Sequence, residues 1–185
     1  MTAIVTLAKW TLEQYHQMIA AGILNDQRVE LLDGEIIQMA PEGPEHAQIS
    51  TDASDYLRAV LGTRALIREA RPITLPDTNS EPEPDIAIVE PLRAIYRTRH
   101  PYPKNVFWLI EYANTSLRKD MDPKAKAYAT AGIAEYWVAN LQNMELIVMR
   151  QPQQDQYMSQ TTLTAGAIAP LAFPDVNISV NELLD

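Results

Sequence analysis

The chain has 185 residues, 46% of them hydrophobic and 21% charged, which excludes a wholly disordered protein and suits one domain with a substantial core. The formal net charge of −9 argues against a protein that coats nucleic acid, because phosphate binding depends on Lys and Arg. It does not exclude an enzyme that acts on nucleic acid, since carboxylates that hold a metal ion count as negative until the cation binds.

Two features of the sequence indicate where the protein works. It has no cysteine, so it can form neither a disulfide nor a thiolate metal site, and this fits a reducing compartment. No apolar run approaches the roughly 20 residues that span a bilayer, and residues 1–10 lack the basic start and apolar stretch of a signal peptide. We therefore expect a cytoplasmic protein that is not associated with a membrane.

The first part of the chain predicts a helix, a hairpin and a second helix. Residues 11–14 resemble a capping box, and apolar residues at 12, 15, 18 and 19 share one helical stripe before Gly22. Asp33-Gly34 is a strong two-residue turn signal within the hairpin expected at 29–39. A longer helix is expected from about Glu45 to Leu61.

The rest of the chain predicts strands around one further helix, which begins with a cap at Asp122 and proline at its first position. We expect an extended stretch at 64–75, a loop at 77–84, strands at 85–89, 106–111 and 135–139, a hairpin partner at 144–149, a Gln-rich hairpin loop at 151–156, a strand near 157–163 and a short helix near 178–184.

This order of elements predicts an α/β (α+β) sandwich built around one mixed β-sheet with flanking helices and an N-terminal β-hairpin. We expect a single domain over residues 1–185. Its core would span about 45–140, with the N-terminal helix and hairpin at 11–39 and a C-terminal hairpin and tail at 141–185.

Two acids stand out because of their positions on apolar strands. Asp85 opens a strand directly after a proline, and Glu111 closes the most hydrophobic strand in the chain. A charge at such a place is costly to bury unless it is paired or binds a metal ion. The alternative is a strand-end acid that lies in water or in a salt bridge.

Lys124 is expected in the first turn of the helix that follows Glu111. A lysine there opposes the helix dipole, which favours anions at that end. It suits a bound phosphate, because the helix N-terminus and the ammonium then act together. The alternative is a structural lysine that pairs with Asp120 or Asp122. Lys126 is the competing candidate, on a different helix face.

These residues, together with four longer segments in the same order, resemble the Uma-type restriction endonuclease family of the PD-(D/E)XK nuclease superfamily. The similarity covers residues from about 11 to 150, and its segments are 30–35 (ELLDGE), 44–46 (PEH), 111–120 (EYANTSLRKD) and 124–137 (KAKAYATAGIAEYW), with Pro84-Asp85 between them. The superfamily usually places its lysine two residues after the second acid, where this chain has Ala113. The resemblance implies that the lysine lies instead on the following helix, which fits Lys124.

The resemblance implies a restriction-endonuclease-like core and a metal-dependent endonuclease that hydrolyses phosphodiester bonds in DNA. Mg²⁺ (or Mn²⁺) would be held by Asp85, Glu111, waters and the backbone carbonyl of Tyr112. The metal would polarise the scissile phosphate and lower the pKa of a water, while Lys124 orients that water or stabilises developing charge.

The resemblance also implies auxiliary groups near the metal. The family places an acidic or polar residue on the first core helix, where Glu45 and His46 are the matching positions; a structural hydrogen bond is the alternative for His46. Asp120 and Tyr128 are further auxiliary candidates, and Tyr128 shares a helix face with Lys124. Glu30 falls in the first motif, but a hairpin acid facing water is the simpler reading.

Residues 93–104 contain no acid and interleave basic with aromatic side chains, which suits a phosphate backbone and stacked bases. The candidate DNA-binding residues are Arg93, Arg97, Arg99 and Lys104, and a solvated loop is the alternative. We expect a homodimer, because two symmetric sites can cut both strands. The competing functions are a nuclease-like binding module without catalysis and a hydrolase of another phosphodiester.

Overall fold

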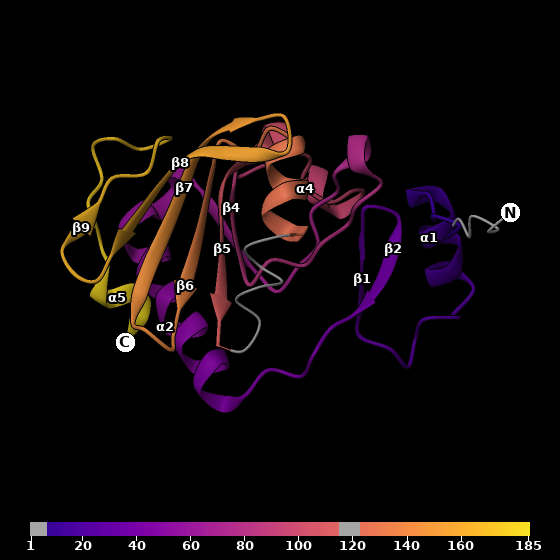
Figure 1. The fold of residues 1–185 in the computed structure, drawn as a ribbon, viewed down its shortest axis with the longest axis horizontal. Helices are drawn as coiled ribbons and strands as arrows, with labels where there is room; N and C mark the ends of the chain where they lie inside the picture. Colours follow the sequence, from indigo (N-terminus) through magenta and orange to yellow (C-terminus); the bar gives the residue numbers. More distant parts are fainter. Residues whose placement is uncertain (1–6, 115–122) are drawn as a thin grey trace, which may run out of the picture.

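The computed structural model describes residues 7–114 and 123–185, and its centre is a six-stranded mixed sheet (Figure 1). The spatial order is β3-β4-β5-β6-β7-β8. Only β5 and β6 run parallel, and every other neighbouring pair in this sheet is antiparallel. The strands are β3 (Leu66–Glu69), β4 (Ile86–Val89), β5 (Val106–Ala113), β6 (Glu135–Asn140), β7 (Glu145–Gln153) and β8 (Gln156–Leu163). The expected mixed sheet is confirmed.

Helices cover both faces of this sheet, because its central strands are apolar on both sides. Ile86 and Ile88 of β4 pack into one buried cluster with α2 (Pro44–Leu61) and α5 (Asn181–Leu184). Ala87 and Val89 belong to a second cluster with α4 (Ala125–Thr130). Alternate residues of one strand thus face opposite helical layers. The parallel pair β5 and β6 needs a crossover connection, and α4 lies on it.

The N-terminal hairpin forms as the sequence predicts. Helix α1 (Leu12–Ala20) precedes strands β1 (Val29–Leu32) and β2 (Glu35–Gln38), which pair antiparallel. Asp33 and Gly34 both have positive φ, at 49° and 74°, as a tight hairpin turn of this kind requires. The hairpin reaches the rest of the chain where the amide of Glu81 donates to the carbonyl of Leu31 at 2.7 Å.

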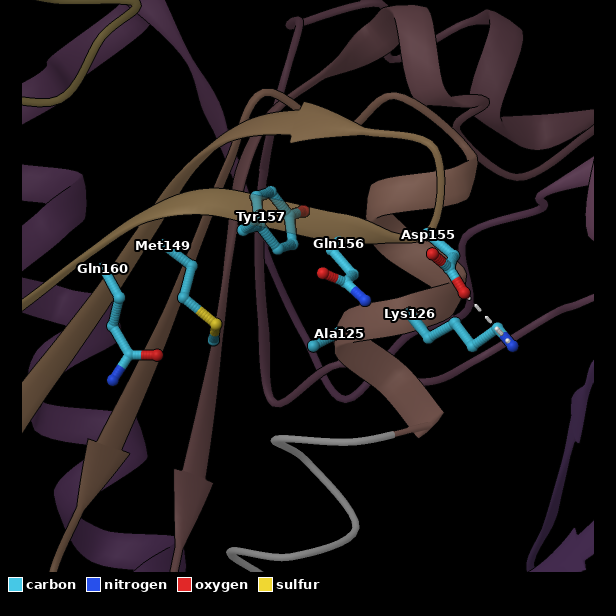
Figure 2. Close-up of a pocket in the computed structure, with 7 residues that line it drawn as sticks. All are labelled: Ala125, Lys126, Met149, Asp155, Gln156, Tyr157 and Gln160. Atoms are coloured by element: carbon cyan, nitrogen blue, oxygen red, sulfur yellow. Dashed lines mark ion pairs between the residues drawn. The ribbon is translucent and has the colours of Figure 1, made fainter.

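The C-terminal hairpin is longer than the sequence predicts. The Gln-rich loop expected at 151–156 is wrong, because β7 continues to Gln153 and β8 begins at Gln156. Only Gln154 and Asp155 lie between the strands, and Gln154 takes the positive φ of 56° that a tight turn demands. Asp155 then faces α4 and pairs with Lys126 at 3.4 Å (Figure 2).

The remaining elements are short. The extended stretch expected at 64–75 is a strand only in its middle, at β3, and a two-stranded sheet precedes the expected C-terminal helix α5. None of the helices in the described ranges has the length and apolar character that crossing a membrane requires. The small elements are η1 (Gly62–Arg64), η2 (Pro76–Thr78), η3 (Ile95–Arg97), η4 (Pro103–Asn105), β9 (Ala167–Ile168) and β10 (Ile178–Ser179).

Candidate active site

The two acids singled out in the sequence meet at one end of the β4–β5 pair. Ile86 lies opposite Ile110 in the antiparallel register. One step further along this register places Asp85 opposite Glu111, and directly opposed residues of antiparallel strands project from the same face. Two carboxylates that are 26 residues apart in the sequence therefore become neighbours.

Asp85 is fixed by the neighbouring strand β5 and by helix α2. The backbone N–H of Tyr112 donates to its Oδ2 at 2.6 Å. His46, in the first turn of α2, places Nε2 at 3.4 Å from the same oxygen, which is an ion pair only when the imidazole is protonated. Because the N–H and C=O of one strand residue point toward the same strand edge, the Tyr112 carbonyl faces the side on which Asp85 lies.

Glu111 is held by two side chains at the start of the following helix. Its Oε1 accepts from Lys124 Nζ at 2.8 Å and from the Tyr128 hydroxyl at 2.9 Å. Burial, and then the charge of Glu111, raises the pKa of Tyr128 well above its usual value, so this hydroxyl stays protonated and donates. The two donors lie four residues apart and so share a helix face, as the sequence predicts.

The helix that carries these donors ends in a glycine turn that hydrogen-bonds the backbone of Tyr128. Gly132 has φ of +74°, and its N–H donates to the carbonyl of Ala129. The next amide, that of Ile133, donates to the carbonyl of Tyr128 at 3.0 Å. This closure satisfies the last carbonyls of a six-residue helix and needs a residue that adopts positive φ easily.

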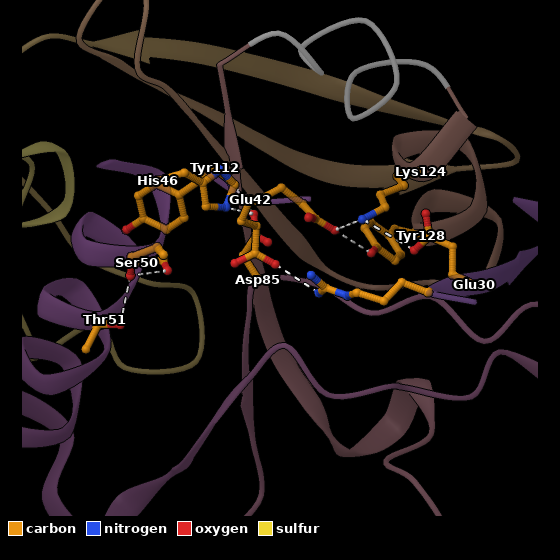
Figure 3. A network of polar contacts seen from close by, with 12 residues as sticks. Glu30, Glu42, His46, Ser50, Thr51, Asp85, Tyr112, Lys124 and Tyr128 are labelled. Atoms are coloured by element: carbon orange, nitrogen blue, oxygen red, sulfur yellow. Dashed lines mark hydrogen bonds and ion pairs between the residues drawn. The ribbon is translucent and has the colours of Figure 1, made fainter. Parts of the chain in front are cut away.

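Glu30 joins the same cluster, although it comes from the N-terminal hairpin. Its side chain is fully buried, and its Oε2 lies 3.6 Å from Lys124 Nζ. The expected water-facing hairpin acid is therefore not what the structure shows. Figure 3 shows Glu30, Lys124 and Tyr128 together on one side of Asp85, with His46 and Tyr112 on the other.

Both acids and Lys124 border a pocket of about 420 Å³. Burial raises the pKa of the Glu83 carboxyl in its wall; the nearby charge of Arg28 lowers it less, and that of Glu30 raises it further. Among the described residues, the polar and charged side chains lining the pocket are Gln38, Glu42, Glu45, His46, Glu83, Asp85, Glu111, Asn114 and Lys124, with Tyr112 beside them.

The two candidate lysines point to different places. Lys124 is 3% exposed and lines the pocket, whereas the Lys126 side chain is 65% exposed and pairs with Asp155. Glu45 is exposed at the rim of the pocket. Asp120, the other auxiliary candidate, and Asp122 lie outside the described residues.

The basic stretch at 93–104 lies at the opposite end of the β4–β5 pair, beyond Val89 and Val106. None of its four candidate DNA contacts is among the described residues that line the pocket. Arg99 is engaged within the loop itself, where it donates to the Asn105 side chain at 3.1 Å and stacks over Tyr102. The structure thus does not bring this stretch to the carboxylates.

The chemistry of the pocket fits a hard cation such as Mg²⁺. Across residues 7–114 and 123–185, no group of three or more His, Cys, Asp and Glu side chains is arranged to hold a metal ion. Mg²⁺ does not need such a group, because it commonly uses one or two carboxylates and keeps several waters. Asp85 and Glu111 supply those two carboxylates, and the pocket beside them has room for water.

The mixed sheet, with two acids at one end and a lysine on its crossover helix, has a nuclease-like fold. The chain matches the Uma2 family model, described as "Putative restriction endonuclease", over residues 12–181. The chain therefore belongs to the Uma2 family, which confirms the resemblance seen in the sequence.

A solved structure supports the fold over nearly the whole chain. A protein from Anabaena variabilis, described as a "putative nuclease", superposes with a TM-score of 0.70 at 16% identity, covering 94% of this chain and 97% of that one. At this identity the likeness concerns the fold alone. No match was found among curated proteins.

Proposed function

We propose that this chain is a Mg²⁺- or Mn²⁺-dependent endonuclease that hydrolyses phosphodiester bonds in DNA at the pocket of Asp85, Glu111 and Lys124. The observation that carries the proposal is the buried contact of 2.8 Å between Lys124 and Glu111 in the pocket wall. Buried ion pairs contribute little net stability compared with apolar residues of similar volume. An ion pair placed at a pocket beside a second acid is more readily explained by chemistry. Membership of the family supports the class of reaction.

The cation would be held by the carboxylates of Asp85 and Glu111 and by the carbonyl of Tyr112. When bound, Mg²⁺ supplies Lewis acidity toward phosphate oxygens. The protein's own contribution is to fix these oxygens in advance. The Tyr112 N–H orients Asp85 at 2.6 Å, and the Tyr128 hydroxyl orients Glu111 at 2.9 Å. Oriented ligands of this kind keep their geometry without reorganisation during the reaction.

Lys124 would act on the phosphate that is being cleaved. Its ammonium brings a positive charge into a wall whose described residues include the carboxylates of Glu42, Glu45, Glu83, Asp85 and Glu111. As an entering water attacks phosphorus, negative charge grows on the phosphate oxygens, and a buried ammonium stabilises that charge more strongly than one in bulk water does. Its contact with Glu111 keeps the ammonium next to the acid that holds the cation.

His46 is the remaining polar group that approaches Asp85. Its Nε2 lies 3.4 Å from Asp85 Oδ2, so the imidazole can steady this carboxylate from the α2 side of the sheet. Glu45 precedes it on the pocket rim and, being exposed, is available to a ligand that enters from solvent. Both are proposed as auxiliary residues.

The test is hydrolysis of several substrates by one preparation. Supercoiled plasmid, linear duplex, single-stranded DNA and a small phosphodiester are incubated with Mg²⁺, with Mn²⁺ or with EDTA. Metal-dependent nicking of DNA that EDTA abolishes supports the endonuclease. Hydrolysis of the small phosphodiester alone would favour a different phosphodiesterase. Binding of DNA without cleavage of any substrate by the folded protein would favour a binding module.

Three further expectations belong to this proposal. A homodimer would present two symmetric sites to a duplex, and sedimentation of the purified chain tests it. The basic stretch at 93–104 would contact the DNA backbone away from the cleavage point, since duplex DNA extends well beyond one phosphate. A cytoplasmic location would place the enzyme with its DNA, and cell fractionation tests that.

The extent of the domain, a single one over residues 1–185, also stays a prediction.

A further inference from the structure

Glu30 carries a fully buried carboxylate that makes two contacts with the candidate active site. Its Oε2 lies 3.6 Å from Lys124 Nζ and accepts the backbone N–H of Glu83 at 3.2 Å. Glu83 is two residues before Asp85 in the chain. One oxygen of Glu30 thus touches the side chain of the candidate lysine and the backbone segment that leads to the first acid.

The place of Glu30 relative to the pocket limits what it can do. Lys124, Glu111 and Glu83 line the pocket, whereas Glu30 is not among the described residues that do. Glu30 therefore lies behind Lys124 as seen from the pocket. Because its side chain is fully buried, it is placed to act through the lysine and through the Glu83 backbone.

The attachment of the hairpin explains how Glu30 reaches this place. Leu31, its neighbour in β1, pairs with Glu81, whose amide donates to the Leu31 carbonyl at 2.7 Å. Strand β1 thus runs beside the segment 81–85 that ends at Asp85. The hairpin lies outside the sheet that carries the two acids, yet its Glu30 carboxylate lies beside their site.

Burying a carboxylate is costly unless partners compensate for the lost hydration. Lys124 and the Glu83 amide are two such partners. Lys124 in turn lies between Glu30 and Glu111, with Nζ 3.6 Å and 2.8 Å from their oxygens. When Glu111 serves a cation, Glu30 is still beside the ammonium and able to keep it in place.

We propose that Glu30 is a positioning residue of this site, which holds the Lys124 ammonium and the backbone leading to Asp85. This inference rests on the proposed nuclease function for its effect on catalysis, but the ordering of Lys124 can be measured without any activity. The competing view is that Glu30 is a buried structural acid whose loss affects folding only.

Glu135 offers a matched control for that view. It is also fully buried, and it accepts from Arg150 Nε and from Trp137 Nε1, both at 2.8 Å. It lies at the start of β6, three residues before Val138, the partner of Glu111. Glu135→Gln therefore removes an equally buried charge away from the site.

The first measurement is the mobility of the Lys124 side chain, read by NMR of lysine-labelled protein. The chain has only five lysines, so the signals are few, and Lys124→Gln assigns the one of interest. We expect Lys124 to be as ordered in Glu135→Gln as in the wild type and more mobile in Glu30→Gln, where Glu111 still accepts from the ammonium but the charge of Glu30 no longer holds it. A Lys124 that is as ordered in folded Glu30→Gln as in the wild type would overturn the proposal. If Glu30→Gln does not fold, Glu30→Asp carries the same test with the same two outcomes.

The second measurement is the steady-state kinetics of DNA cleavage. Groups that orient active-site residues without contacting the substrate commonly contribute about 10- to 100-fold to activity. We expect Glu30→Gln to lower kcat by about that factor with little change in KM, and Glu135→Gln to keep the wild-type kcat. Equal kcat in both folded variants overturns the positioning role. Absence of cleavage by the wild type would count against the nuclease, and the NMR result would still decide the role of Glu30.

Discussion

The two ends of the β4–β5 pair differ in chemistry although the same two strands build both. One end brings Asp85, Glu111 and Lys124 together around a pocket, with most of their charges buried. The other end carries the basic stretch 93–104, where Arg93, Arg97 and Lys104 are exposed. Asp85 and Val89 are four residues apart, so the ends lie about 13 Å from one another at roughly 3.3 Å per residue.

This difference separates two tasks that a nuclease needs. The buried end can fix charges for chemistry, because ions in a dry, organised site interact more strongly than ions in water. The exposed end can attract a polyanion but cannot organise a reaction, since exposed charges are screened by salt. Substitutions at the pocket should therefore change kcat, and substitutions in the basic stretch should change affinity.

The largest difference in cleavage rate is expected between substitutions of two nearby lysines, Lys124 at the start of α4 and Lys126 within it. Lys124→Gln removes the ammonium from the pocket wall and should lower the cleavage rate by at least about 100-fold. Lys126→Gln breaks an exposed pair with Asp155, which contributes about 0–1 kcal/mol, and should leave the rate within about twofold. Plasmid cleavage by both variants, with circular dichroism to verify folding, measures this. Equal losses in the two variants would contradict the assignment of Lys124.

Part of this arrangement could be predicted from the sequence. The strand after Asp85, the strand that carries Glu111 and the helix face of Lys124 follow from local patterns of burial and helical period, although β5 continues past Glu111 to Ala113. Glu30 could not be placed in the same way, because the buried side of the hairpin depends on its contact with Glu81, some 50 residues later in the chain. The first motif already included Glu30, but a motif does not state what a residue touches.

The error at the C-terminal hairpin also comes from pairing that the local sequence does not show. Residues 151–156 are rich in Gln and contain Pro152, so they resemble a loop, yet pairing of Pro152 with Tyr157 continues the hairpin to a two-residue turn. Proline is tolerated there because the pairing of β7 with β6 ends at Arg150, so Pro152 faces no β6 residue on that side. The basic stretch joins the two strands, so its distance from the acids depends on how the strands pair. The antiparallel register places it at their other end.

A moderate effect is expected for Tyr128→Phe. The substitution removes the 2.9 Å hydrogen bond to Glu111 and leaves Lys124 as a donor to the same oxygen. A hydrogen bond to a charged group contributes about 1.5–3 kcal/mol, so the free energy of unfolding should fall by about that amount and kcat by about tenfold. Urea unfolding and kinetics at saturating DNA test this. An unchanged kcat would show that Lys124 alone orients Glu111.

The basic stretch should affect binding and leave the chemical step intact. Each phosphate contact contributes about one unit to the slope of log affinity against log salt concentration. Replacing Arg93, Arg97 and Lys104 together by Gln should therefore weaken DNA binding and flatten that slope by as much as about three units, with kcat near the wild-type value. Fluorescence anisotropy over a range of salt concentrations measures the slope. A lowered kcat at saturating DNA would contradict the division of tasks between the two ends.

The smallest effect concerns the pH dependence of stability at the exposed end. Burial lowers the pKa of His100; the charge of Glu81 opposes this shift, and that of Arg68 adds to it. The unfolded chain therefore takes up a proton near the usual histidine pKa of about 6.5 while the folded protein resists it, so stability is lost as pH falls below that value. His100→Gln should lose less stability than the wild type between pH 7.5 and 5.5. The free energy of unfolding is measured by urea at each pH, and an equal loss in the two proteins would contradict this.

The most direct test of the central claim is a comparison of the wild type with Asp85→Asn in metal binding and in DNA cleavage. Asn keeps the shape of the side chain and an oxygen that can accept from the Tyr112 N–H, so the fold should survive while the charge is lost. We expect Asp85→Asn to bind Mn²⁺ much more weakly and no longer to cleave plasmid in Mg²⁺ or Mn²⁺. Wild-type binding and cleavage by folded Asp85→Asn would contradict it and would move the active site elsewhere.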